Sequence, residues 1–337
     1  MNLPRHRVFN HQAFSHQASG RRAFGRRAFG GVLGGLAGLA LPGLAQAATR
    51  IRIGYQKNGA LVLVRQQGRL EPLGLTPEWV EFSSGPPMLE ALNAGAVDFG
   101  AVGDTPPIFA QAAGSDLLYV GAQPVSGANS AILVRADGPV RTLADLKGRR
   151  LAFTRGSSAH NVALKALARA GLTTAEVQVV NLQPPDAGAA FRTGAIDAWS
   201  IWDPFFAIAE ADPATRVLTT AEGLAPSNSF FLASRGFATR EPGAVSGVLE
   251  AINGAAGWAR ANPEELAQSL ARVTGVPLPA QRVAAARGVY AAQPLDDAII
   301  AQQQAIADTF AALRIIPARL DIRAAVWRPA HTQAARR

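Results

Sequence analysis

Cysteine is absent from the 337 residues of this sequence, and histidine is scarce. Without cysteine the chain has no disulfide framework, no thiolate ligands for zinc or iron–sulfur clusters, and no thiol nucleophile. Only two of the five histidines, His160 and His331, lie beyond residue 47, which excludes a metal site built from several histidines. Charged residues make up 17% of the chain, below the roughly 25% that is usual. With an ordinary apolar content, this composition argues against disorder and against a coiled coil.

Acidic residues are absent from the first 47 positions, which carry six arginines. The net charge of +9 depends mainly on this segment, because the remainder has 27 basic and 24 acidic residues. A nucleic-acid-binding domain needs a basic stripe on its folded surface. The sequence shows no such stripe beyond residue 47, so we expect no nucleic-acid partner.

Residues 21–47 have the composition of an export signal. Two arginine pairs precede a glycine-rich apolar stretch and the small-residue cleavage pattern Ala-Gln-Ala at 45–47. The apolar stretch is too short for a membrane span, which needs about 20 residues. Arg-Arg-Ala-Phe occurs at 21–24 and again at 26–29, which favours the twin-arginine route over the general secretory route. Because no cysteine is available for a lipid anchor, we expect cleavage near Ala47 to release a soluble periplasmic protein.

The rest of the chain contains one pattern twice. A short apolar strand and a Gly/Asn loop occupy 52–59, and a strand with a Gly/Ser loop occupies 150–158, 98 residues later. Further on, GAVDFGAVGD at 95–104 matches GAIDAWSIWD at 194–203, with an offset of 99. Internal repeats of this kind predict two similar lobes.

Helical patterns separate the predicted strands. This alternation indicates βαβ units, so the predicted fold class is α/β, with a mostly parallel sheet flanked by helices in each lobe. A further strand at 230–234 follows the second copy, so the chain must return between the lobes. From 242 to 312 the pattern is helical, and we expect this extension to pack on one lobe.

These features predict three parts of the chain. The export signal covers 1–47. The first lobe is discontinuous, with 48–126 and 235–337, and the second lobe is 127–234.

The loop at 156–161 is a candidate binding site. In parallel α/β sheets, ligands bind beyond the carboxyl ends of strands, where loops lead into helix N-termini. Gly156, Ser157 and Ser158 offer an anion backbone N–H groups, two hydroxyls and the positive end of a helix dipole. Alternatively, Ser157 is only a helix N-cap. We interpret His160 as a hydrogen-bond donor or structural cap rather than a catalytic base, because a serine nucleophile and a base adjacent in sequence rarely face each other.

Asp104 and Asp203 end the repeated motif in the two lobes. Proline follows both closely, which is typical of a helix start, so capping accounts for both carboxylates. As a catalytic pair they lack a supporting base or metal cluster. A third interpretation is that one of them selects an ammonium group of a ligand.

Gln56 and Trp202 complete the candidate site. Gln56 ends the first strand and either donates its amide N–H to an anionic oxygen or lies in a solvated loop. Trp199 and Trp202 straddle the end of one strand, where one residue of such a pair faces the cleft and the other packs. We choose Trp202, beside Asp203, as the apolar wall. Neutral donors suit reversible capture of an anion, because no unpaired cation is buried when the site is empty.

Six motifs from residue 51 onward carry a family resemblance. They are IRIGYQK at 51–57, WVEF at 79–82, GPPMLEALN at 85–93, GDTPPIFAQA at 103–112, GSSAHN at 156–161 and AWSIWDP at 198–204. In this order they resemble the periplasmic aliphatic sulfonate-binding proteins of sulfonate ABC importers, over about residue 50 to Trp327. The GDT and WDP elements alone also occur in relatives that bind taurine, nitrate or thiamine precursors.

The resemblance implies a periplasmic-binding-protein type II fold, whose two lobes close on a ligand in the cleft. It also implies a sulfonate held by the 156–161 loop and Gln56. Asp104 and Thr105 would contribute from the first lobe, and Trp202 and Asp203 from the second. The implied ligand-binding residues are Gln56, Asp104, Thr105, Ser157, Ser158, His160, Asn161, Trp202 and Asp203. Ala159 stands where a serine is usual in the family, which removes one hydroxyl donor.

The function expected on this basis is capture of alkanesulfonates and their delivery to an ABC permease and ATPase complex for sulfur acquisition. We expect a monomer without cofactor or metal. The alternatives are a binding protein for taurine, nitrate or a thiamine-precursor pyrimidine, an enzyme on the same fold, and a sensor or chaperone-like protein. An enzyme would need a catalytic cluster that the sequence lacks, and a protein without a solute would leave the 156–161 loop without a purpose.

Overall fold

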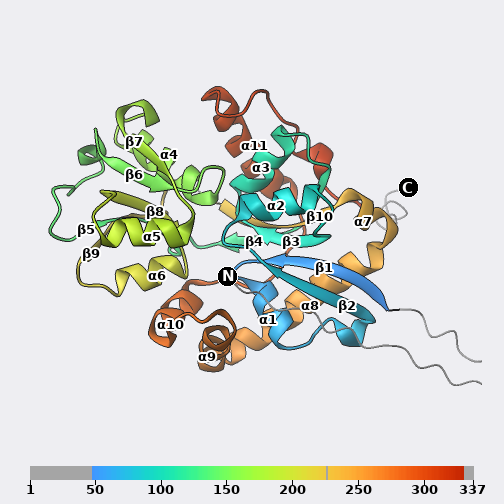
Figure 1. Cartoon of the computed structure of the whole chain (residues 1–337). Coiled ribbons are helices and arrows are strands. Elements are labelled where there is room, and N and C mark those ends of the chain that lie inside the picture. The colour runs from blue at the N-terminus through green and yellow to red at the C-terminus, as the bar shows by residue number, and fades with distance from the viewer. Residues whose placement is uncertain (1–47, 225–226, 330–337) are drawn as a thin grey trace, which may run out of the picture. The chain divides into compact units, whose positions relative to one another are not determined.

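The computed structural model describes residues 48–224 and 227–329, which belong to one unit. The predicted export signal, its cleavage site and His331 lie outside the described residues. Two five-stranded sheets with helices packed on them form the framework of this unit (Figure 1). In the described ranges, no helix is long and apolar enough to cross a membrane.

The first sheet has the strand order β2-β1-β3-β10-β4. Its strands are β1 (Thr49–Tyr55), β2 (Leu75–Glu81), β3 (Phe99–Val102), β4 (Leu117–Val125) and β10 (Ser227–Ser234). β1 runs parallel to β2 and β3, and β10 runs antiparallel to β3 and β4.

The second sheet repeats this arrangement in the order β7-β6-β8-β5-β9. Its strands are β5 (Ser130–Arg135), β6 (Arg150–Phe153), β7 (Gln178–Asn181), β8 (Ala198–Trp202) and β9 (Thr215–Thr220). β6 is parallel to β7 and β8, while β5 is antiparallel to β8 and β9.

The antiparallel strands show where the chain crosses between the sheets. After β4 the chain enters the second sheet as β5, and after β9 it returns to the first sheet as β10. In each sheet one strand, β10 or β5, is antiparallel to its neighbours, and the other four run in the same direction, in agreement with the predicted mostly parallel sheets. One assignment differs from the expectation. Residues 227–234, which the sequence assigned to the second lobe, belong to the first sheet, because their backbone pairs with β3 and β4.

The repeated Gly-Ala-(Val/Ile)-Asp motif has the same structural role in both lobes. The Asp98 carboxylate accepts hydrogen bonds from the backbone N–H and guanidinium of Arg52 on β1. Asp197 accepts the same set from Arg150 on β6. Each arginine also donates to the carbonyl of the motif's glycine, Gly95 or Gly194. In each lobe the motif therefore links an arginine of one strand to the loop before a neighbouring parallel strand. Because both copies make the same hydrogen bonds, they confirm the predicted duplication.

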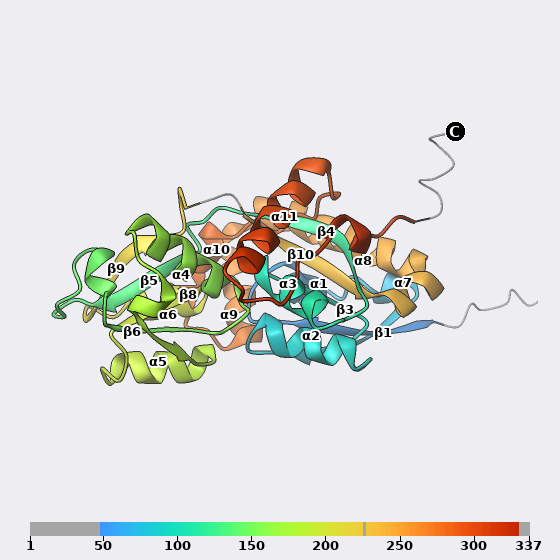
Figure 2. The same ribbon diagram turned by 90° about the horizontal axis from the view of Figure 1, so that it is seen from above.

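Helices cover the faces of both sheets (Figure 2). On the first sheet these are α1 (Ala60–Gln66), α2 (Gly85–Asn93), α3 (Thr105–Ala112), α7 (Arg235–Arg240), α8 (Pro242–Ala261) and α11 (Asp297–Ala312). On the second they are α4 (Ser158–Arg169), α5 (Pro184–Arg192) and α6 (Phe205–Glu210). Short 3₁₀ turns lie at Glu71–Leu73, Ala144–Leu146, Thr174–Glu176 and Arg323–Ala325. α2 and α5 both have a Pro-Pro pair in their first turn, after Gly85 in α2 and at the start of α5, and proline's fixed φ suits this part of a helix.

Burial of apolar side chains holds each sheet between its helices. In the first lobe, Ile53, Phe99 and Phe231 are inaccessible or nearly so. In the second lobe, Leu133 and Phe153 take the same place. Truncating a core leucine of this kind to alanine costs about 2–5 kcal/mol, so each sheet is a rigid platform for the loops at its carboxyl end.

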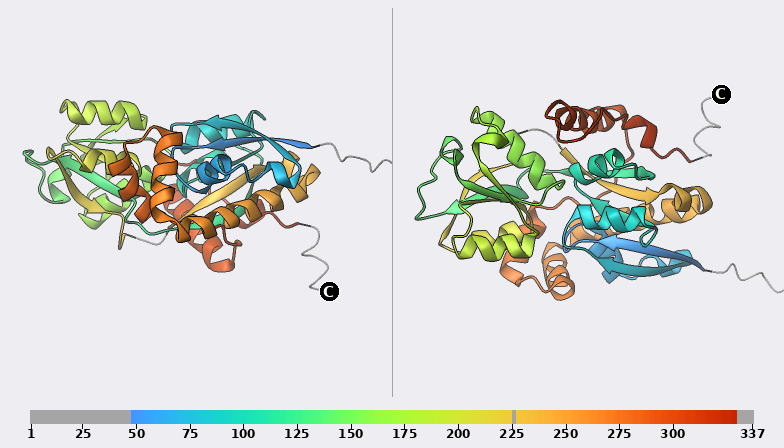
Figure 3. Two further views of the ribbon diagram at one scale, coloured as in Figure 1. Left: turned by 90° about the horizontal axis from the view of Figure 1, so that it is seen from below. Right: turned by 45° about the horizontal axis from the view of Figure 1, so that its top comes forward.

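The remaining helices, α9 (Pro263–Thr274) and α10 (Leu278–Arg287), do not stay on one lobe as expected. α9 contacts α1 of the first lobe, whereas α10 contacts α6 of the second (Figure 3). Small apolar residues carry the latter contact, with Ala207 packed in a cluster with Val276, Ala280 and Ala284. The extension therefore bridges both lobes and brings the end of α10 to the space between them.

Candidate ligand-binding site

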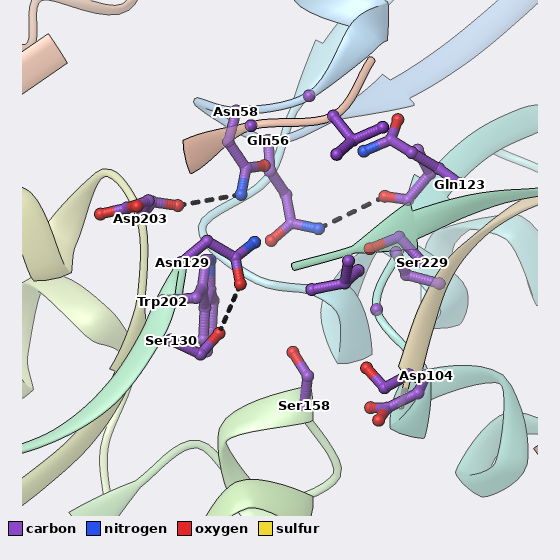
Figure 4. Close-up of a pocket in the computed structure, with 18 of the residues that line it drawn as sticks. Gln56, Asn58, Asp104, Gln123, Asn129, Ser130, Ser158, Trp202, Asp203 and Ser229 are labelled. Atoms are coloured by element: carbon purple, nitrogen blue, oxygen red, sulfur yellow. Dashed lines mark hydrogen bonds between the residues drawn. The ribbon is translucent and has the colours of Figure 1, made fainter. Parts of the chain in front are cut away.

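A cavity of about 130 Å³ lies between the carboxyl ends of the two sheets. One water needs about 10–15 Å³ on this measure, so the cavity has room for a small organic molecule. Both lobes line it, together with β10 and the end of α10 (Figure 4). Seven of the nine predicted site residues lie on its wall, namely Gln56, Asp104, Ser157, Ser158, Asn161, Trp202 and Asp203.

The start of α4 faces this cavity without a side-chain cap. Ser157 holds the N-cap position, but its hydroxyl donates to the Thr154 carbonyl at 2.7 Å and forms no hydrogen bond to α4. The capping interpretation of Ser157 is therefore wrong. Ser158 keeps its hydroxyl free of hydrogen bonds within the described chain and points it into the cavity (Figure 4). The unpaired N–H groups and dipole of the first turn of α4 remain available to an anion.

Asp104 joins the two lobes. Its carboxylate accepts from Asn161 Nδ2 on α4 at 2.7 Å and from the Thr105 hydroxyl at 2.8 Å. No side-chain bond caps α3, so the capping interpretation of Asp104 is also wrong. Burial raises the pKa of Asp104, while the hydrogen bonds from Thr105 and Asn161 oppose that shift. Thr105 is completely buried behind Asp104 and does not line the cavity.

Asp203 occupies the other end of the cavity wall. Its Oδ1 accepts from the Ala207 N–H in the first turn of α6 at 3.0 Å, as a cap would, although Pro204 rather than Asp203 holds the N-cap position. Arg287 of α10 lies 3.5 Å from the same oxygen. Burial raises the pKa of Asp203 to about 6, although Arg287 opposes that shift. The other oxygen, Oδ2, is buried without a hydrogen-bond partner in the described chain.

His160 does not reach the cavity. Its ring stacks on Phe153 at 4.7 Å between centroids and meets Phe310 of the first lobe edge-on at 5.2 Å. Nδ1 accepts from the Gly156 N–H at 3.3 Å, which requires that nitrogen to be unprotonated. Burial lowers the pKa of His160 to about 4. His160 therefore supports the 156–161 loop through an accepted hydrogen bond and ring packing, which corrects its prediction as a ligand-binding residue and hydrogen-bond donor.

Gln56 and Trp202 lie on the wall of the cavity. Gln56 Nε2 makes one long hydrogen bond of 3.3 Å to the Ala101 carbonyl, so it can reorient towards a ligand. Trp202 is 8% exposed and meets Phe205 edge-on. Trp199 faces the core against Phe191, as the alternation along the strand predicts.

Several residues of the wall were not predicted. Asn58 donates to the Asp203 backbone carbonyl at 2.9 Å and so links the lobes. The others are Gln123, Asn129, Ser130, Lys165, Ser229, Gln281, Arg287 and Tyr290. Asn58 stands in a loop that the sequence singled out, but the remainder reach the cavity only through strand crossing and helix packing.

Two of these residues are cations, which corrects the expectation of purely neutral donors. Arg287 Nη2 donates to Glu210 Oε2 at 2.9 Å, and its guanidinium covers the Phe206 ring at 4.3 Å. Lys165 on α4 makes no hydrogen bond or ion pair within the described chain. Burial lowers the pKa of Lys165, and the Asp104 carboxylate opposes that shift. The paired Arg287 thus neutralises Asp203, while Lys165 adds positive potential near α4.

The described ranges contain no group of three or more histidine, aspartate or glutamate residues arranged to hold a metal ion. The cavity therefore offers hydrogen-bond donors, an apolar ring and one positive region.

Comparison with known proteins agrees with this description. The NMT1/THI5-like family model matches residues 73–266. The aliphatic sulfonates-binding protein of Escherichia coli (strain K12) is 41% identical over 310 residues, which cover 86% of this chain and 96% of the relative. The solved alkanesulfonate-binding protein SsuA from Xanthomonas axonopodis pv. citri, bound to MOPS, is 43% identical with a TM-score of 0.80, covering 83% of this chain and 98% of the other. For SsuA from Escherichia coli the identity is 41% and the TM-score 0.76, with coverage of 83% and 92%. The chain therefore belongs to the NMT1/THI5-like family and, within it, to the aliphatic sulfonate-binding proteins.

Proposed function

We propose that this protein captures aliphatic sulfonates between its two lobes and delivers them to an ABC importer. The observation that carries the proposal is the uncapped start of α4, which presents the free Ser158 hydroxyl and unpaired N–H groups to the cavity. A sulfonate is anionic throughout the physiological pH range, and it has three oxygens to accept these bonds. Helix N-termini bind such groups through their N–H donors and dipole.

The remainder of the cavity suits the alkyl part of the ligand. Trp202 provides an apolar face on the second-lobe side. Gln56 and Gly103 stand on the first-lobe side. A ligand between them contacts both lobes at once and stabilises the closed arrangement, which is a hinge closure.

Export and delivery complete the proposal. Residues 1–47 act as the export signal and are removed by cleavage near Ala47, and the protein works in the periplasm as a monomer. The permease recognises the closed form and takes the sulfonate, and the ATPase drives its import for sulfur acquisition. The relatives named above support this role, because they are sulfonate-binding proteins rather than enzymes.

Calorimetric titration tests the proposal. The protein is titrated with ethanesulfonate, taurine, nitrate and sulfate, in a buffer free of sulfonates because buffers such as MOPS would compete. We expect ethanesulfonate to bind with micromolar or tighter affinity, and nitrate and sulfate to give no heat of binding. Binding of nitrate, together with silence for every sulfonate, would refute the proposed ligand class.

A further inference from the structure

A pair of helix starts connects the lobes outside the cavity. Ser84 is the N-cap residue of α2 in the first lobe, and Gln183 is the N-cap residue of α5 in the second. The Ser84 hydroxyl donates to Gln183 Oε1 at 2.8 Å, and the Ser83 hydroxyl donates to the same oxygen at 3.2 Å. None of the three residues lines the cavity. α2 and α5 lie on the same side of the two sheets (Figure 2).

The Ser84 hydroxyl is committed to this contact. Ser84 is fully buried, and its side chain makes no capping bond to α2. A serine at an N-cap ordinarily bonds its own helix, which contributes about 1 kcal/mol. Here the hydroxyl donates to the other lobe instead, so removing the acceptor while the lobes are together leaves a buried donor without a partner.

The contact joins equivalent positions of the two repeats. Ser84 and Gln183 are 99 residues apart, which is the offset of the repeated motif. Two further links cross between the lobes, although Asn58 and Asn161 are 103 residues apart and so do not follow the repeat offset. Asn58 of the first lobe donates to the Asp203 carbonyl, and Asn161 of the second donates to the Asp104 carboxylate. Both lobes therefore donate hydrogen bonds across the interface, and the contact of Ser84 with Gln183 is the one that joins equivalent positions.

We propose that Ser83, Ser84 and Gln183 form a clasp that holds the lobes closed and sets ligand affinity without touching the ligand. The observed affinity of a protein that must close is its intrinsic affinity multiplied by the fraction of closed molecules. A clasp outside the cavity raises that fraction for any ligand. Gln183 is accordingly a positioning residue, and the choice of ethanesulfonate as probe rests on the proposed function.

Matched variants of Gln183 test the clasp. Gln183→Leu keeps the size of the side chain and removes the acceptor, whereas Gln183→Glu retains an acceptor for both hydroxyls. The loss of one or two hydrogen bonds corresponds to about 3- to 10-fold weaker ethanesulfonate binding in Gln183→Leu, with faster dissociation. Gln183→Glu should restore binding. Ser84→Ala should weaken binding similarly, and the double variant Ser84→Ala/Gln183→Leu should add little further loss.

The distance between the lobes gives a readout that does not depend on the ligand. Because the chain has no cysteine, labels can be attached at Leu73→Cys and Lys147→Cys, two exposed positions on different lobes. Without ligand, Gln183→Leu should shift this distance towards longer values, and Gln183→Glu should not. An unchanged distance in Gln183→Leu would overturn the clasp, whether or not binding weakened. If no sulfonate bound to the protein or to any variant, the proposed ligand class would be wrong. The distance between the labels would still show whether the clasp holds the lobes together.

Discussion

Burial among aromatic rings decides the role of His160. His160 is 4% exposed and its ring packs against Phe153 and Phe310, while its Nδ1 accepts a hydrogen bond from the Gly156 N–H. Protonation would place a charge in this apolar site and break that contact. A histidine that stands beside two serines in the sequence therefore contributes to stability rather than to catalysis or ligand binding.

The pH dependence of stability follows from this site. The pKa of His160 is about 4 in the folded state, below its ordinary value of 6.5. The unfolded chain therefore binds the proton more tightly, and stability is lost as the pH falls from 6.5 towards 4. Between pH 6.5 and 5 we expect His160 to account for about 2 kcal/mol of the fall in unfolding free energy. Urea denaturation at the two pH values measures this fall in unfolding free energy. In His160→Phe the fall should be smaller by the contribution of His160. Equal pH dependence in both proteins would contradict the assignment.

Trp202 acts through the area of its ring. Each methylene buried against an apolar wall contributes about 0.8 kcal/mol, so affinity should rise along a series of alkanesulfonates of increasing length. Trp202→Ala should weaken pentanesulfonate binding much more than methanesulfonate binding, and Trp202→Phe should fall between. Competitive titration of the series measures these ratios. Equal losses at every chain length would remove Trp202 from the alkyl subsite.

At the scale of an element, α4 concentrates the binding chemistry at one end. Its first turn combines a free hydroxyl, uncapped N–H groups and the dipole. Lys165, two turns along, adds positive potential on the same cavity wall. One helix therefore supplies the proposed anion site, while both lobes and α10 supply the remainder of the cavity wall.

Adjacent serines at this helix start provide a matched pair of variants. Ser158→Ala removes a free hydroxyl from the cavity, and the loss of a hydrogen bond to a charged ligand should weaken ethanesulfonate binding about tenfold. Ser157→Ala removes a hydroxyl that donates to Thr154. It should lower unfolding free energy by about 1 kcal/mol and change affinity little. Calorimetry and denaturation of both variants separate the two effects. A larger loss of affinity in Ser157→Ala would reverse these roles.

At the scale of the whole molecule, the sequence predicts what is local. The loops that follow strands are visible in the chain, so Gln56, Ser158 and Trp202 are placed on the cavity correctly. The duplicated motif predicts two lobes, because each copy builds the same strand–loop–helix unit. Residues that reach the cavity through packing are different. Arg287 lies on the cavity wall because α10 packs on the second lobe through Ala207, Ala280 and Ala284. No local sequence pattern predicts that contact.

The crossing of the chain between the two sheets is the other feature that could not be predicted from the sequence. The position of β10 in the first sheet depends on pairing with β3 and β4, which are more than 100 residues away in the chain. The apolar residues of β10 are compatible with either sheet, so the prediction of a second lobe at 127–234 is wrong for this strand. The same exchange puts Asn129 and Ser130 on the cavity wall, because the segment that crosses between the sheets passes beside Trp202.

The most direct test of the account is a crystal structure of the protein with ethanesulfonate. The account predicts the sulfonate oxygens within hydrogen-bond distance of Ser158 Oγ and the first N–H groups of α4, with the ethyl group against Trp202. A sulfonate bound instead at Arg287, or outside the space between the lobes, would contradict it.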